Sequence, residues 1–394
     1  MSTTTTDQAR LLTDDMLARF DERAPTYDRE NRFFQEDWDE LRQSGYLLAA
    51  VPTDMGGAGL KLDAVARLQS RLAYHAPATA LGVNMHLYWT GLAADLLRAG
   101  DESCRWMLEK AAEGEVFAAI HGEAGNDVPL LLSTTSAERV DGGWRLNGHK
   151  IFGSLTPVWT YAGFHAMDSS NPEAPQIVHG FVTRDSPGLQ IIETWDTLGM
   201  RATQSQDTVL DGVFVPDSQC PVVCPAGFAG AGLFHLNVFA WALLGFAAVY
   251  LGAARRAYDI TLKRMPERTS IALTRSMAHH PEVQHNVSDM RIALDAAEAL
   301  LDRTCTDWAN GEPYLDWPVR FLSTRSFVID KAFEVVDTAV DLSGGAAAFK
   351  RDRLEQLFRD VRMGRFHPGN TMMVHEVIGK LCLGVNPDEP PRWG

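Results

Sequence analysis

The sequence predicts a mostly helical α+β protein, and three observations along its 394 residues support that prediction. Apolar residues recur three and four positions apart in the first and last parts of the chain, which is the spacing of amphipathic helices. Between these parts they alternate in short runs, which is typical of strands. Strands and helices do not alternate, and no Gly-x-Gly-x-x-Gly follows a strand, which argues against a Rossmann fold or a barrel enzyme. The expected domains are residues 1–115 (helical), 116–228 (β) and 229–394 (helical bundle).

The N-terminal domain is predicted from two stretches with helical spacing, "DWDELRQSGYLL" and "AVARLQSRLAYHA". The Gly-rich segment "VPTDMGGAGL" lies between them and predicts a turn. The first residues, "MSTTTTDQARLLTDDM", lack a basic patch followed by an apolar core. We therefore expect a short frayed leader rather than a signal peptide, and a cytoplasmic protein.

The central domain is predicted from seven alternating runs that Gly, Asp, Asn and Pro clusters separate. These runs are "FAAIHG", "TTSAERV", "GWRLNGHKIFGS", "YAGFHAMD", "IVHGFVTR", "LQIIETW" and "TVLDGVFVP". The segment "VDGGW" predicts a tight hairpin, because Asp-Gly-Gly supplies the positive φ angles of such a turn.

The C-terminal domain is predicted from a return of the helical spacing. Helices are expected near 236–264, 281–310, 317–342, 351–363 and 371–382. The most apolar window, residues 239–258, is interrupted by Arg255 and Arg256 and is rich in Ala and Gly. These features favour a buried helix over a membrane span.

The net charge and the spacing of cysteine and histidine residues limit which ligands the protein could bind. A net charge of -15 and the absence of basic runs interleaved with aromatic residues exclude a nucleic-acid surface. The five cysteines have no paired spacing and no flanking histidines of metal-site type, so we expect neither disulfides nor a metal site. The pair His279-His280 lacks acidic or cysteine partners and is expected to be solvated surface.

The segment "HPGN" at 367–370 interrupts two amphipathic runs. Pro368 has no amide donor and Gly369 loses the most backbone entropy, so the chain must turn there. His367 then lies at a helix end, where a titratable side chain can face a cavity. The alternative is an ordinary turn between helices.

Five segments resemble the acyl-CoA dehydrogenase superfamily, and they occur in that family's order. The most specific is "DTLGMRATQSQDTVLDGVFVP"; the others are "VPTDMGGAGL", "HGEAGND", "NGHKIFGS" and "DLSGGAAAF" with "LEQLFRDVR". The resemblance implies an N-terminal helical domain, a central β-barrel-like domain and a C-terminal four-helix bundle. It also implies a flavin, FAD or FMN, and a homotetramer or dimer.

The resemblance implies roles for particular residues. The loop with Gly125 and Asn126 would approach the flavin, Phe152 would stack on its ring, and Ser154 would hydrogen-bond beside it. Gly344 and Gly345 would serve the cofactor of a neighbouring subunit, and Asn370 would lie near the cofactor. Arg264, Arg268 and Arg275 are candidates for the cofactor's phosphates, and we select Arg268.

The residues at the family's catalytic positions differ from the usual ones. The glutamate that serves as base in many acyl-CoA dehydrogenases falls on Pro368, and a second family position for a carboxylate falls near Ala242. Neither residue can take a proton. Glu376 lies too far along its helix to replace the base.

The chain resembles instead the family's flavin-dependent monooxygenase branch, which includes the dibenzothiophene and hydroxyphenyl monooxygenases. That branch implies His86, Ser154 and His367 as catalytic residues. Members of the branch can carry a second histidine three residues before the last one, and this chain has Gly364 at that position. It implies an oxygenase that uses O2 and reduced flavin from a separate reductase. The substrate would be a small molecule, a thioester or an aromatic compound.

Three alternatives stay open. The protein could be a dehydrogenase of an acyl thioester with an unusual base such as Glu123. It could be a non-catalytic flavin-binding subunit that completes a partner's site. His86 and His367 could be core histidines that only hydrogen-bond.

Overall fold

The first part of the chain is helical, as predicted. The structure is a computed structural model that describes residues 10–389, so the expected leader at 1–9 lies outside the described residues. The helices are α2 (Asp14–Glu30), α3 (Gln35–Gln43), α4 (Leu62–His75), α5 (Pro77–Arg98) and α6 (Arg105–Ala112). Thr13 caps α2, because its hydroxyl accepts a hydrogen bond from the Met16 amide. Helix α5 is apolar on nearly all sides and correspondingly buried.

The central part forms one eight-stranded sheet. Its strands are β1 (Phe117–Ala119), β2 (Ser136–Val140), β3 (Gly143–Gly153), β4 (Tyr161–Asp168), β5 (Gln176–Thr183), β6 (Leu189–Ile192), β7 (Gln206–Pro216) and β8 (Val222–Pro225). They pair in the order β6-β7-β3-β2-β4-β5-β8, and β1 adds to β4. The predicted central β-domain is confirmed, and in the described residues its outer strands β6 and β8 do not pair with each other.

The predicted hairpin joins β2 to β3. Val140 pairs with Gly143, which leaves Asp141 and Gly142 as a two-residue turn. Gly142 has a φ of 74°, a value that glycine adopts without steric cost. The expected turn at this position is confirmed.

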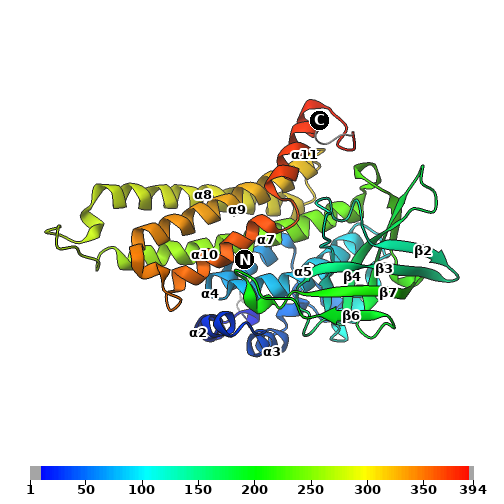
Figure 1. Cartoon of the computed structure of the whole chain (residues 1–394), viewed down its shortest axis with the longest axis horizontal. Helices are drawn as coiled ribbons and strands as arrows, with labels where there is room; N and C mark the ends of the chain where they lie inside the picture. Colours follow the sequence, from blue (N-terminus) through cyan, green and yellow to red (C-terminus); the bar gives the residue numbers. More distant parts are fainter. Residues whose placement is uncertain (1–9, 390–394) are drawn as a thin grey trace.

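The C-terminal part returns to helices close to the predicted bounds. They are α7 (Leu233–Arg264), α8 (Pro281–Ala309), α9 (Trp317–Ser343), α10 (Arg353–Met363) and α11 (Thr371–Leu383). Helix α7 runs through the middle of the molecule and packs on α4, α5, α8 and α9 (Figure 1). Its most apolar window is 89% buried, so α7 is a core helix by its packing.

Small residues allow α7 to approach its neighbours closely. A side chain on Gly245 would collide with Asn84 of α5, and one on Gly252 would collide with the backbone of Ser70 in α4. The predicted richness of this window in glycine and alanine therefore serves helix packing.

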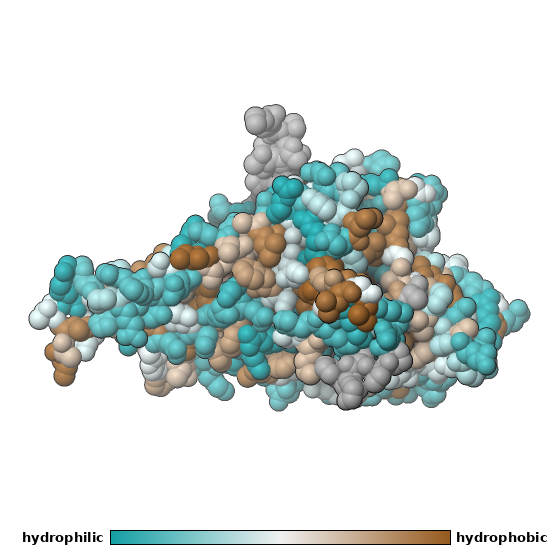
Figure 2. Space-filling model, turned by 90° about the horizontal axis from the view of Figure 1, so that it is seen from above, coloured by the Kyte–Doolittle hydropathy of each residue, from teal (hydrophilic) through white to brown (hydrophobic). Residues whose placement is uncertain are grey.

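The molecule is elongated, with the sheet at one end and the far ends of α7, α8 and α9 at the other (Figure 1). Apolar surface gathers in patches over its middle, while much of the surface toward both ends is hydrophilic (Figure 2). Two signature segments distant in sequence meet beside the bundle, because the Met200 amide donates to Asp360 at 2.6 Å.

Candidate active site

A pocket of about 720 Å³ lies between the sheet and the helical bundle. Its wall combines residues of α5, the loop at 121–131, the end of β3, α7, the start of α9, and the segment from 363 to 373. A volume of this size suits a cofactor ring or a small-molecule substrate. Of the expected site residues, the pocket brings together Asn126, Phe152, Ser154, His367 and Asn370.

The predicted break at 367–370 forms one side of this pocket. Helix α10 ends at Met363, a short 3-10 turn follows, and Gly369 reverses the chain with a φ of 77°. Asn370 then caps α11, because its side-chain oxygen accepts from the Met373 amide at 3.1 Å. The sequence "HPGN" thus holds His367 between two helices and against the pocket.

His367 is fixed by two aromatic residues of α7. Its ring stacks on Phe246 with centroids 4.5 Å apart, and its Nε2 lies 2.7 Å from the hydroxyl of Tyr250. Burial and the nearby Arg325 lower the pKa of His367 to about 3, so the ring is neutral near pH 7. Tyr250 is fully buried, and donating its proton to Nε2 satisfies the hydroxyl. The proton of His367 then resides on Nδ1.

Ser154 belongs to a chain of hydroxyl groups. Its Oγ lies 2.7 Å from the Oγ of Ser205, which lies 2.7 Å from the Oγ1 of Thr203. Thr203 donates onward to the carbonyl of Met200. All three hydroxyl residues line the pocket, so the site can offer a hydroxyl donor whose orientation the chain controls.

Phe152 has a strained backbone. Its φ is 60°, a value rare for residues with a side chain, and its ring is 48% exposed although it lines the pocket. The ring edge meets Trp195 with centroids 5.7 Å apart. Such strain is often found at functional sites, where a particular side chain must face a ligand.

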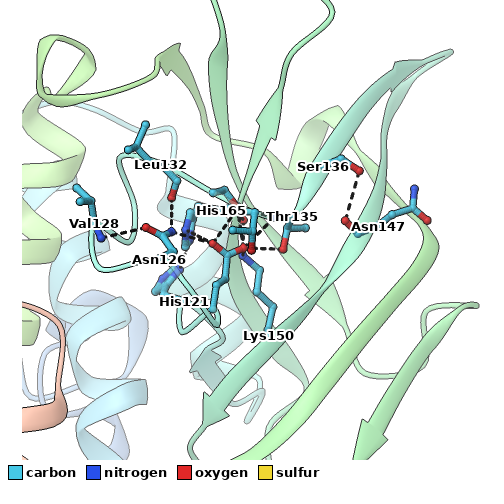
Figure 3. A network of polar contacts seen from close by, with 12 residues as sticks. His121, Asn126, Val128, Leu132, Thr135, Ser136, Asn147, Lys150 and His165 are labelled. Atoms are coloured by element: carbon cyan, nitrogen blue, oxygen red, sulfur yellow. Dashed lines mark hydrogen bonds and ion pairs between the residues drawn. The ribbon is translucent and has the colours of Figure 1, made fainter. Parts of the chain in front are cut away.

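Glu123 is the shared partner in a buried polar network, and its partners Asn126, Thr135, Lys150 and His165 are labelled in Figure 3. Lys150 contacts its Oε1 at 2.6 Å, the backbone amides of Thr134 and Thr135 donate to it, and so do the hydroxyls of Ser133 and Thr135. Burial opposes its ionisation, but His165 and Lys150 outweigh burial and hold the pKa of Glu123 well below its usual range. This carboxylate is a structural anion and a poor base, against the expectation for a thioester dehydrogenase.

The loop "GEAGND" is anchored by that same carboxylate. The Asn126 amide donates to Glu123 at 2.8 Å and to the Leu132 carbonyl at 2.7 Å, and its oxygen accepts from the Val128 amide. The sequence analysis expected the side chain of Asn126 to contact the cofactor. In the structure it donates instead to Glu123, an acidic residue of its own loop. Gly125 has a φ of 77° and open space beside its Cα, so a ligand can approach its backbone.

His121 is a pocket residue that the sequence analysis did not select. It is 9% exposed, lines the pocket, and sits 3.2 Å from His165 through the two Nδ1 atoms. Its position one residue before the quoted "GEAGND" loop was the available signal.

His86 lies apart from the described pocket lining, in the core of α5. Its Nε2 contacts the Leu47 carbonyl at 3.1 Å, and its Nδ1 accepts from the Phe117 amide at 3.1 Å. Both ring nitrogens are thus used by the backbone. This geometry matches the alternative of a core histidine, and we leave His86 out of the proposed site.

His179, Cys224 and His235 form a second buried cluster, with ligand-type atoms within 4.8 Å of one another. The Nδ1 of His235 accepts from the Gly232 amide, so its Nε2 carries the proton and donates to His179 at 3.0 Å. In this hydrogen-bonded arrangement the two histidines form a pair beside the Cys224 thiol.

Comparison with known proteins identifies the family. The N-terminal, middle and C-terminal domains of acyl-CoA dehydrogenase match residues 4–115, 118–213 and 244–371. The chain belongs to the acyl-CoA dehydrogenase superfamily. Members of this superfamily with the present fold are flavin-dependent oxidoreductases, and so is this enzyme.

Similar members of the superfamily differ in activity. The amino sugar nitrososynthase DnmZ of Streptomyces peucetius is 30% identical over 384 residues, covering 91% of this chain and 88% of DnmZ. The putative acyl-CoA dehydrogenase YdbM of Bacillus subtilis is 28% identical over 370 residues, covering 92% of each chain. The structure of KijD3 with FMN and dTDP-3-amino-2,3,6-trideoxy-4-keto-3-methyl-D-glucose has a TM-score of 0.81 at 24% identity, covering 99% of this chain and 96% of KijD3.

Both positions expected for the superfamily's catalytic carboxylate lie in the pocket wall. They hold Pro368 and Ala242, and neither can accept a proton. Glu376 of α11 pairs with Lys380 at 2.9 Å and is not among the lining residues described. The two positions where the sequence analysis expected a catalytic carboxylate thus hold side chains that cannot accept a proton.

The residues expected to hold cofactor phosphates lie far from the pocket. Arg268 contacts the Leu342 carbonyl, and its guanidinium lies against Gly344, whose φ is 62°. Arg264 pairs with Asp352, and Arg275 contacts His279. They belong to the end of α7, the connection from α7 to α8, and the end of α9, and these helix ends lie opposite the sheet (Figure 1). Within one chain, Arg268, Gly344 and Gly345 are brought together with one another and not with the pocket.

Proposed function

We propose that this protein is a flavin-dependent oxygenase that acts on a neutral, largely apolar small molecule. One observation carries the substrate class: among the described residues, the pocket lining includes neither lysine nor arginine. Its ionisable groups are the acids Glu123 and Asp127, two histidines and two tyrosines, and aliphatic and aromatic side chains make up most of the rest. A phosphate or carboxylate on the substrate would find no cation in this lining.

The pocket residues fit a flavin. Phe152 presents an exposed ring at the wall, and Ser154 offers a hydroxyl; beside the lining residue Asn126, Gly125 has an open backbone that a ligand can approach. A reduced flavin held there would supply activated oxygen from O2. Ser154 and His367 would then orient the reacting groups, because a hydroxyl and a neutral imidazole N–H can both donate hydrogen bonds.

The missing carboxylate supports oxygenation over dehydrogenation. Removing the α-proton of a thioester requires a base, and the two positions for it hold Pro368 and Ala242. Similarity to a nitrososynthase supports the same choice, since its name implies oxidation of its substrate. The similarity to YdbM keeps the dehydrogenase as the second candidate.

The remaining features of the proposal follow from the site. A separate reductase would supply reduced flavin, as FAD or FMN, because the sequence lacks a nicotinamide-type motif. The enzyme would be a cytoplasmic dimer or tetramer in which Arg268, Gly344 and Gly345 reach the cofactor of a neighbouring subunit. In that arrangement the pocket of one subunit would meet Arg268, Gly344 and Gly345 of another, although in a single subunit they lie at opposite ends of the folded molecule.

A direct experiment separates the candidates. Purified protein would be loaded with flavin and mixed anaerobically with acyl thioesters, and separately supplied with reduced flavin, O2 and neutral aromatic compounds. Oxygen-dependent product formation supports the proposal. Anaerobic bleaching of the flavin by a thioester identifies a dehydrogenase. If neither reaction is observed, the protein is a non-catalytic flavin-binding subunit.

A further inference from the structure

Arg325 is a buried cation of helix α9, next to the turn that carries His367. Its side chain is 1% exposed, and in the described part of the chain it forms no ion pair with a carboxylate. The next acidic residue along α9, Asp330, pairs with Arg365 at 3.1 Å. Burying a charge without a counter-charge is costly. A buried guanidinium at this place therefore needs a local explanation.

The guanidinium of Arg325 binds the backbone of the "HPGN" turn. Its Nη2 donates to the carbonyl of Gly364 at 2.8 Å and to the carbonyl of His367 at 3.2 Å. These two residues begin and end the short 3-10 turn that follows α10. Carbonyls at the end of a helix carry partial negative charge, which suits a cation. One side chain thus ties both ends of the turn and fixes where the His367 backbone lies.

The charge of Arg325 also acts on the His367 ring. Burial, followed by Arg325, lowers the pKa of His367 to about 3. Tyr250 of α7 faces the ring from the other side, with its hydroxyl 2.7 Å from Nε2. Burial and Asp360 of α10 raise the pKa of Tyr250 while Arg325 opposes them, so the phenol keeps its proton. These neighbours together favour a neutral imidazole whose Nε2 accepts from Tyr250.

We propose that Arg325 is a positioning residue for His367, because its backbone contacts place the ring and its buried charge keeps the ring a neutral hydrogen-bond donor. The inference rests on the proposed function, since Arg325 acts there only through His367. Arg325 is not among the described pocket-lining residues, so it has no direct role toward a substrate. Lysine would keep the charge and its donors, whereas methionine would keep only an apolar chain of similar length.

Nitrogen NMR of the full chain without flavin tests this role in the absence of turnover. Histidine would be labelled with ¹⁵N, and the His367 signals assigned by their loss in His367→Ala. In the wild-type protein we expect a protonated Nδ1 and an unprotonated Nε2. Arg325→Met and Arg325→Gln should shift these signals and raise the pH at which the ring takes up a proton by about one unit, whereas Arg325→Lys should keep them.

A matched control is Lys331→Gln, which removes a cation of the same helix that pairs with Glu334 near the surface. It should leave the His367 signals unchanged. Near-ultraviolet circular dichroism identifies the variants that fold. Arg325→Gln retains an amide donor for the turn, so it serves if Arg325→Met does not fold. Wild-type His367 signals in a folded variant without the Arg325 charge would overturn the proposal.

Turnover gives an independent test through a double-mutant cycle. In the flavin-loaded enzyme, Arg325→Met should lower kcat by about 10-fold with KM nearly unchanged, because the ring is misplaced while the pocket lining is intact. Arg325→Lys should restore most of the loss. In the His367→Ala background, Arg325→Met should cost nothing further, and additive losses would refute action through His367. If the NMR result holds but no substrate is oxygenated, the proposed function fails and the positioning of His367 by Arg325 stands.

Discussion

The hydroxyl of Tyr250 lies 2.7 Å from Nε2 of His367, and this contact makes His367 a donor toward the pocket. Helix α7 supplies the tyrosine, and the "HPGN" turn supplies the histidine. The two residues are 117 positions apart in the sequence, so only folding brings them together.

His367→Ala should lower oxygen-dependent turnover by about 10²-fold, the scale for losing a general acid or base, while folding and flavin affinity stay nearly intact. Tyr250→Phe should have a smaller effect in the same direction, because it frees the tautomer and keeps the ring. Steady-state kinetics and flavin titration measure both. Full activity in His367→Ala would show that the histidine is structural.

Pro368→Glu restores a carboxylate at the superfamily's usual position. Under the oxygenase proposal it should not raise oxygen-dependent turnover, because that reaction does not remove an α-proton from a thioester. Anaerobic stopped-flow spectroscopy with acyl thioesters checks the result. New or faster flavin reduction would identify the scaffold as a dehydrogenase site.

Glu123→Gln should destabilise the protein by about 3 to 5 kcal/mol, because it leaves the Lys150 ammonium buried without its counter-charge. Lys150→Met should also destabilise it. The double variant should lose less stability than the two single variants lose together, because it leaves neither charge unpaired. Denaturant unfolding of all four proteins completes the cycle, and strict additivity would contradict a coupled pair.

Phe152→Gly should raise the free energy of unfolding or leave it unchanged, although it deletes a large ring. Glycine relieves the positive φ at this position, by roughly 1 kcal/mol, and the ring it removes is half exposed. Flavin affinity should fall, because the stacking surface is gone. Thermal unfolding and flavin titration separate the effects; unchanged affinity would mean that the ring does not meet the cofactor.

His86 should affect stability rather than catalysis. Burial lowers its pKa to about 4 in the folded protein, against about 6.5 in the unfolded chain, so the fold favours the neutral ring. Its contribution is fully present above about pH 6.5 and is lost as the pH falls toward 4. His86→Leu should lower stability at pH 7.5 and flatten the acid dependence, while turnover per folded molecule is kept. If His86→Leu folds normally but loses turnover, His86 is catalytic, as the sequence analysis first predicted.

Much of the architecture was predictable from periodicity. Apolar spacing determined the five C-terminal helices, whose observed bounds start at Leu233, Pro281, Trp317, Arg353 and Thr371. Alternation predicted β1 to β7 but not the short strand β8, and Asp-Gly-Gly predicted the β2–β3 hairpin. These features follow from local rules, because burial of one face and the φ of a glycine are encoded within a few residues.

Closure of the sheet was not predictable in this way. The sequence predicted a barrel-like β-domain without a strand order; in the described residues the outer strands β6 and β8 do not pair with each other. Which strands pair at an edge depends on contacts between segments distant in sequence, and alternation is the same for an open or a closed sheet.

The sequence alone predicted that Pro368 stands where related enzymes carry a base, and it placed a histidine at the adjacent helix break. Only the tertiary structure decided which histidines have a nitrogen left to act. Both ring nitrogens of His86 are taken by the backbone of Leu47 and Phe117, whereas His367 lines the pocket with its Nε2 held by Tyr250. Residue identity specifies that an imidazole is present; its tautomer and its pKa are specified by neighbours that only folding brings within a few ångströms.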